Sequence, residues 1–121
     1  MSSARSFEDL WIWQQARKLV AEIYSDFVEG TPGCRDFGFR DQIQRAGVSI
    51  MNNIAEGFER SSDTEFARFL DIAKGSCGEV RSMYYTAEDL VYVSNHVAVE
   101  RREMAKQLSA GIASLRAHLK K

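Results

Sequence analysis

The sequence predicts an all-α fold, an antiparallel up-down-up-down four-helix bundle that also assembles with copies of itself. The chain has 121 residues and a single proline, Pro32, so long segments lack any helix breaker. Apolar residues recur every three or four positions along four separate stretches, which is the period of an α-helix with one buried face. At 45% hydrophobic residues the chain has the material for one core, and its length is that of one domain, residues 1–121.

The first helix is expected over about 7–28, with Ser6 as its N-cap. The segment Gly30-Thr31-Pro32-Gly33 then ends it, because glycine and proline both disfavour helix continuation. Its predicted core face repeats at helical spacing and comprises Ile12, Trp13, Ala16, Leu19, Val20, Ile23, Tyr24 and Phe27.

The second helix, expected over about 38–58, has an unusually wide apolar face. A central stripe is widened on one side by small and apolar residues, and the whole arc comprises Phe39, Ile43, Ala46, Gly47, Val48, Ile50, Met51, Ile54 and Ala55. Because this arc exceeds what one neighbour covers, we expect packing on two sides, which favours the inner helix of a bundle that also assembles with copies of itself. Asn52 and Asn53 are mediocre helix formers, and a hydrogen-bonded network to a neighbouring helix or subunit would account for Asn53.

The third and fourth helices are expected over about 63–93 and 96–119. Ser62 and Glu65 have capping-box spacing before the third, and Ser94-Asn95 breaks the chain before the fourth. The third carries a seam close to heptad spacing, from Phe66 through Cys77 to Val91. The apolar stripe of the fourth is narrow, which predicts a peripheral helix with one buried side.

Several residues fit a minimal bundle poorly and are candidates for a subunit interface. Interior glycines weaken a helix but allow another backbone to approach closely, and an exposed tryptophan is unusual. The candidates are Trp11, Met51, Asn52, Asn53, Gly75, Gly78, Ser82 and Tyr85. The alternative for each residue taken singly is ordinary scattered surface apolarity.

No residue pattern predicts catalysis or a cofactor. His96 and His118 have no neighbours at metal-ligand spacing, and the glycines form no phosphate-binding fingerprint. Cys34 and Cys77 are too few for a disulfide framework, and free thiols are expected. We therefore expect a non-enzymatic protein with no cofactor and no metal. Without a membrane-spanning run or a signal-type apolar segment at residues 1–6, a cytoplasmic location is expected.

A basic stripe on the fourth helix is the one signal for a charged ligand. Residues 101–121 hold six basic side chains and one acid, a net charge of +5, whereas the whole chain has a net charge of −1. The candidate nucleic-acid contacts on this stripe are Arg102, Lys106, Arg116 and Lys120. The alternative is that cations simply suit the negative end of a helix dipole.

Five short motifs give the chain a family resemblance. They are Phe7-Glu8-Asp9-Leu10, Trp13-Gln14-x-Ala16, Gln42-Ile43-x-Arg45-Ala46, Ser49-Ile50-x-x-Asn53-Ile54-Ala55-Glu56-Gly57 and Ala73-x-Gly75-Ser76. With them the chain resembles the four-helix-bundle family of 23S rRNA intervening-sequence (S23-type) proteins. The resemblance implies a ring-like homo-oligomer, with a pentamer favoured. It also implies kinship with the accessory variability protein of diversity-generating retroelements, a basic pentamer that binds nucleic acid and a reverse transcriptase.

Together these observations favour a homo-oligomeric scaffold or adaptor whose partners are copies of itself and an unidentified protein, with no membrane partner. The alternative function is a module that binds structured RNA or associates with ribosomes through the basic stripe.

Overall fold

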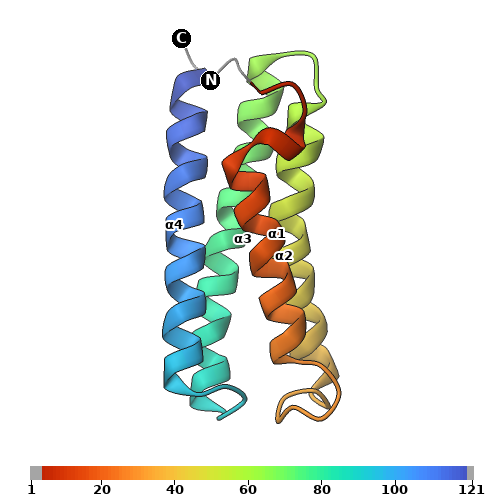
Figure 1. The fold of residues 1–121 in the computed structure, drawn as a ribbon, viewed down its shortest axis with the longest axis vertical. Helices are drawn as coiled ribbons and strands as arrows, with labels where there is room; N and C mark the ends of the chain where they lie inside the picture. The colour runs from red at the N-terminus through yellow and green to blue at the C-terminus, as the bar shows by residue number, and fades with distance from the viewer. Residues whose placement is uncertain (1–3, 120–121) are drawn as a thin grey trace.

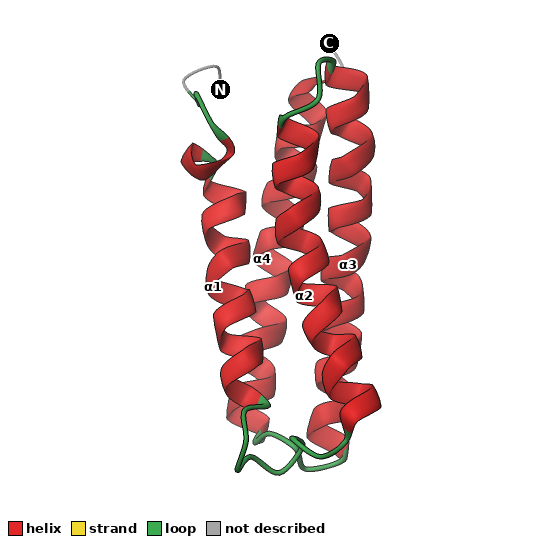
Figure 2. Cartoon of the chain, turned by 90° about the vertical axis from the view of Figure 1, so that its right-hand side faces the viewer, coloured by secondary structure: helices red, strands yellow, loops and turns green. Residues whose placement is uncertain are grey.

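A computed structural model of the chain describes residues 4–119. Neighbouring helices run in opposite directions, and the fourth helix returns to pack against the first (Figures 1 and 2). Helices on diagonal corners are farther apart in this part of the chain, with no Cα atoms within 8 Å of each other. The all-α antiparallel bundle is therefore confirmed, and its elements are η1 (Phe7–Asp9), α1 (Trp11–Asp26), α2 (Phe37–Phe58), α3 (Asp63–Asp89) and α4 (Asn95–Leu119).

The first helix begins later than the sequence indicated. Residues Phe7–Asp9 form a separate 3-10 turn, and Leu10 has an extended backbone with ψ 128°, so α1 begins only at Trp11. The Asp9 carboxylate accepts the Arg5 backbone N–H at 3.0 Å and stabilises this turn. The expected start at residue 7 was wrong because no glycine or proline marks the break at Leu10. At the other end, α1 stops at Asp26, two residues before the expected end.

The third helix ends at Asp89, four residues earlier than expected. The Tyr92 N–H donates to the Ala87 carbonyl at 2.8 Å and the Val91 N–H to the Glu88 carbonyl at 3.0 Å, which is the Schellman pattern of helix ends. Val91 has φ 60° there, where glycine is usual. The expectation that Val91 continues the core seam was therefore wrong, and its side chain is 73% exposed.

Polar side chains cap the other helix starts. The hydroxyl of Ser62 accepts the Glu65 N–H at 3.1 Å, and that of Ser94 accepts the Val97 N–H at 3.1 Å, as their positions in the sequence predicted. Asp36 caps α2 by accepting the Phe39 N–H at 3.2 Å.

The wide apolar face of α2 is covered within the chain. Ile43, Ile50 and Ile54 are fully buried, between α1 on one side and α3 on the other. A Cβ atom at Gly47 would lie 2.7 Å from Ile23 of α1, and one at Gly57 would lie 2.7 Å from the Phe69 Cβ of α3. The two neighbours that this face requires are thus α1 and α3, so it does not by itself require a second subunit.

The expectation that α4 is peripheral was wrong. It packs against both α3 and α1, and its buried residues are Ala98, Arg101, Ala105, Leu108 and Ile112. Two of these are alanines, which bury little area but let helices approach closely. The apolar stripe of α4 therefore looked narrow in the sequence, because part of the buried face consists of alanines and one arginine.

Candidate assembly interface

The outward face of α3 contains two glycines that the fold of one chain does not explain. Gly75 and Gly78 lie in the middle of a 27-residue helix, and a Cβ atom at either would meet nothing within 4 Å. Ser82 is exposed on the same face, and Ile72 and Tyr85 leave about half of their side chains exposed beside it. Exposed glycine in a helix interior is unfavourable by about 1 kcal/mol relative to alanine, and no contact within the described chain accounts for Gly75 or Gly78.

Tyr85 is held in place by charged neighbours. The Arg102 guanidinium lies 3.9 Å from the centre of the Tyr85 ring and 3.0 Å from the Glu88 carboxylate. Hydrogen bonds from Asn95 and from Arg102 lower the pKa of Glu88. The ring of Tyr85 is therefore oriented by contacts within the chain.

Trp11 lies on a different side of the bundle. It is 51% exposed and rests on α4, where a Cβ atom at Gly111 would come within 2.8 Å of its ring. Trp11 and Gly111 border a shallow groove between α1 and α4 that also includes Leu115 and His118. The exposed Trp11 ring and the exposed glycines of α3 thus belong to separate surfaces.

The asparagines of α2 have different environments. Asn53 donates to the Ser49 carbonyl at 2.8 Å and lies 3.0 Å from the Ser49 hydroxyl, which in turn accepts from Ser76 of α3 at 2.9 Å. The network expected around Asn53 therefore exists, and it links two helices of the same chain. Asn52 is exposed and Met51 is half-buried.

Ser49, Asn53 and Ser76 of this network lie in the motifs quoted above, as does Gly57 of the close α2–α3 contact. Comparison with known proteins agrees with that resemblance. The family model of the 23S rRNA-intervening sequence protein matches residues 8–114. This chain belongs to that family. No curated protein that was compared matches the chain.

A solved structure shares the fold of this family member. It is described as a protein with unknown function from the S23 ribosomal protein family of Bacteroides thetaiotaomicron. The likeness has a TM-score of 0.79 at 19% identity, and it covers 91% of this chain and 99% of that one. At this identity the comparison supports the four-helix fold alone. None of the helices described here is long and apolar enough to cross a membrane.

Two of the four candidate nucleic-acid contacts are already ion-paired. Arg102 binds Glu88, and Arg116 binds Asp71 through two hydrogen bonds of 2.7 and 3.0 Å. Hydrogen bonding and the charge of Asp71 raise the pKa of Arg116. Lys106 is exposed, and Lys120 lies outside the described residues. The basic stripe thus presents less free charge than the sequence suggested.

A buried polar cluster that was not predicted from the sequence joins three helices. Arg101 of α4 donates two hydrogen bonds to Asp26 of α1, at 2.8 and 2.9 Å, and Tyr84 of α3 donates to the same carboxylate at 2.7 Å. Burial and the nearby Asp26 raise the pKa of Tyr84. Burial lowers the pKa of Arg101, but Asp26 outweighs it and raises the value. Each buried polar group of the cluster has a hydrogen-bond partner within the chain. The cluster therefore links α1, α3 and α4 and has no unpaired polar group for a ligand.

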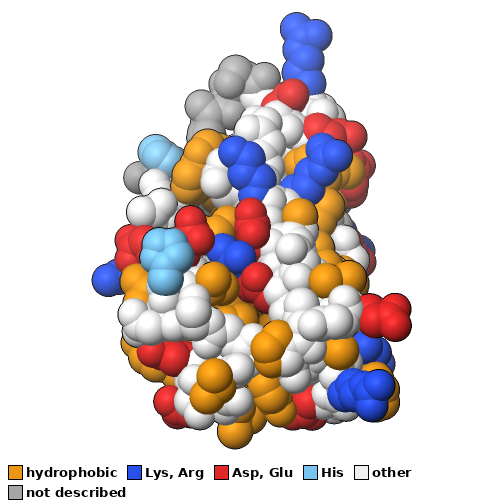
Figure 3. Space-filling view, turned by 60° about the horizontal axis from the view of Figure 1, so that its bottom comes forward, with side chains coloured by type: hydrophobic (Ala, Val, Ile, Leu, Met, Phe, Trp, Pro, Cys, Tyr) orange, Lys and Arg blue, Asp and Glu red, His pale blue; other side chains and the backbone are white. Residues whose placement is uncertain are grey.

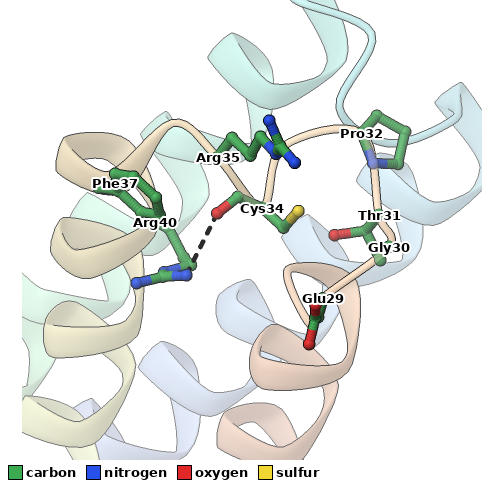
Figure 4. A pocket seen from close by; sticks show the side chains of 8 residues that line it. All are labelled: Glu29, Gly30, Thr31, Pro32, Cys34, Arg35, Phe37 and Arg40. Carbon is green, nitrogen blue, oxygen red and sulfur yellow. Dashed lines mark hydrogen bonds between the residues drawn. The ribbon is translucent and has the colours of Figure 1, made fainter.

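The two thiols and two histidines remain separate. Cys77 is fully buried, and burial raises its pKa to about 12, so the thiol stays protonated near neutral pH. Cys34 borders a cavity of about 610 Å³ at the α1–α2 connection, where Arg40 donates to its carbonyl at 3.2 Å (Figure 4). His96 and His118 are exposed near opposite ends of α4. Within residues 4–119 no three histidine, cysteine or carboxylate side chains gather as metal ligands would.

Proposed function

We propose that this chain is a non-enzymatic, homo-oligomeric scaffold or adaptor. The observation that carries the proposal is the glycine face of α3, defined here as Ile72, Gly75, Gly78, Ser82 and Tyr85, which is open and unexplained within one chain.

The placement of Trp11 supports a ring. A closed ring needs a heterologous contact, in which one surface of a subunit meets a different surface of the next. The glycine face presents room for close approach on α3, and Trp11 presents a large half-exposed ring beside α4. Two different surfaces on separate sides of the subunit are what such a contact uses. The number of subunits that we propose is five, following the family resemblance.

Gly75→Leu is expected to disrupt assembly without unfolding the chain. A leucine has space in the isolated protomer, because nothing lies within 4 Å of the position, but it would block a closely approaching neighbour. Light scattering after size exclusion should give about five times 13.7 kDa for the natural protein and a smaller mass for the variant. Circular dichroism should show the same helix content for both.

Gly38→Leu is the matched control, because a Cβ atom there also meets nothing within 4 Å. It should keep the mass of the natural protein. A natural mass of 13.7 kDa at micromolar concentration would refute the proposal, and an unchanged mass for Gly75→Leu would exclude the glycine face as the contact.

For the RNA-binding alternative we expect weak or absent binding. The chain has a net charge of −1, and Glu88 and Asp71 neutralise two of the stripe's arginines. Gel shifts with rRNA fragments at about 50 mM salt test this, because phosphate contacts are strongest at low salt. A clear shift that disappears at about 200 mM salt, and in a variant with all four candidate contacts changed to glutamine, would favour RNA binding instead.

A further inference from the structure

The end of the bundle opposite the termini exposes large apolar side chains. The α1–α2 and α3–α4 connections lie together at this end (Figures 1 and 2). Four residues within or beside them are at least half exposed, and we call them the apolar end: Val28, Phe37, Leu90 and Val91. In the view that brings this end forward, apolar side chains are spread over it, with acidic side chains among them (Figure 3).

The apolar end rests on a packed support. The Tyr92 ring, directly after Val91, packs edge-on against Phe27 at 6.4 Å and Phe39 at 5.6 Å between ring centres. Its hydroxyl donates to Asp36 at 2.6 Å. Tyr92 thus links the α1–α2 connection to the α3–α4 connection. The exposed side chains of the apolar end are therefore held in fixed positions relative to one another.

Val91 is the residue that the fold explains least. Its φ of 60° is unfavourable for a β-branched side chain and is the conformation in which glycine usually ends a helix. Its side chain is 73% exposed, so packing within the chain offsets little of that strain. Strained backbone concentrates where function requires it, and an exposed strained valine indicates a contact outside the chain.

The charge around the apolar end is negative. Residues 22–41 and 85–102 hold eight acidic side chains and four arginines, a net charge of −4. Three of those arginines, Arg40, Arg101 and Arg102, already pair with acids of the same region. Two copies meeting at this end would bring like charges together, whereas a cationic partner would be attracted.

We infer that the apolar end is a docking surface for a positively charged amphipathic segment of a partner protein, with apolar anchors that cover Val28, Phe37, Leu90 and Val91. This extends the scaffold proposal by naming the chemistry of the partner, and it requires the folded bundle but not a particular subunit number. A helix with apolar anchors on one face and lysines on the other matches such a surface.

A synthetic peptide provides a defined probe. We would use a fluorescein-labelled helical peptide of about 18 residues with leucines on one face and lysines on the other, beside a peptide with glutamate in place of every lysine. Fluorescence anisotropy should show binding of the lysine peptide to the natural protein, and weaker binding at higher salt. The glutamate peptide should not bind.

Val91→Gly and Val91→Asn separate contact from folding, since both residues tolerate positive φ. Each should weaken binding of the lysine peptide on the order of tenfold, while the melting temperature stays the same or rises. Ile72→Ser, which removes a half-exposed apolar side chain from the glycine face, is the control and should bind as the natural protein does.

The inference is overturned if both Val91 variants bind the lysine peptide as tightly as the natural protein does. It is also overturned if the natural protein binds the lysine and glutamate peptides equally, or binds neither. A mass that falls in the Val91 variants would instead identify a second copy as the occupant and would also overturn it. Light scattering on the same samples keeps this result distinct from the scaffold proposal, because loss of assembly in Gly75→Leu leaves the peptide affinity unchanged.

Discussion

Asp26→Ala is expected to lower the free energy of unfolding by about 3 kcal/mol, because it leaves the buried Arg101 guanidinium without its main counter-ion. It also removes the acceptor of the Tyr84 hydroxyl, which is fully buried. We place the effect at the low end for a broken buried pair because Glu22 and Glu100 remain within about 3 Å of the guanidinium. Urea unfolding followed by circular dichroism, at one fixed protein concentration, measures the change.

Glu100→Ala is the control for Asp26→Ala. It removes a carboxylate from the same Arg101, but one whose side chain is 59% exposed, so it should change stability by about 0–1 kcal/mol. The combined change of Asp26→Leu, Tyr84→Phe and Arg101→Met removes every polar member together. It should be less destabilising than Asp26→Ala alone, since no charge or hydroxyl is left buried without a partner. If the combined variant is the less stable of the two, an uncompensated charge is not the reason for the loss.

Where apolar periodicity and polar caps coincide, the sequence predicted the fold well. The start of α3 at Asp63 follows from Ser62, and the start of α4 follows from Ser94, because each hydroxyl satisfies a backbone N–H that the first turn leaves free. Boundaries failed where the chain ends a helix without the usual residue. Leu10 and Val91 adopt non-helical backbone although neither is glycine or proline, so no residue type marks those helix boundaries in the sequence.

Arg101 shows why the polar core was missed. In the sequence Arg101 contributed only to the net charge of +5 over residues 101–121, because arginine is rarely buried unless it is paired. A signal was nevertheless present, since Arg101 continues the helical series of Ala98, Ala105, Leu108 and Ile112. Its partners Asp26 and Tyr84 are 75 and 17 residues away along the chain, and only the packed bundle brings them together.

The candidate interface was predictable in part. Gly75 and Gly78 were recognised because glycine inside a helix is costly, and the structure shows that their outer side is open. The wide face of α2 argued for assembly from sequence, but α1 and α3 satisfy it within the chain. Sequence periodicity indicates how many neighbours a helix needs, but it does not indicate whether they come from the same chain.

Ile54→Ala is expected to destabilise the fold by about 2–5 kcal/mol, because it removes a fully buried side chain from the α2 seam and leaves a cavity. Ile72→Ala makes the same chemical change in α3, at a residue that is 48% exposed, and should alter the stability of the dissociated protomer by about 0.5 kcal/mol or less. Urea unfolding of both variants gives the comparison directly. Since Ile54 is buried within one chain, its penalty should not depend on protein concentration, whereas the penalty for losing an intersubunit contact would shrink as dilution dissociates the subunits. Equal penalties at the two isoleucines would mean that Ile54 does not lie in the protomer core.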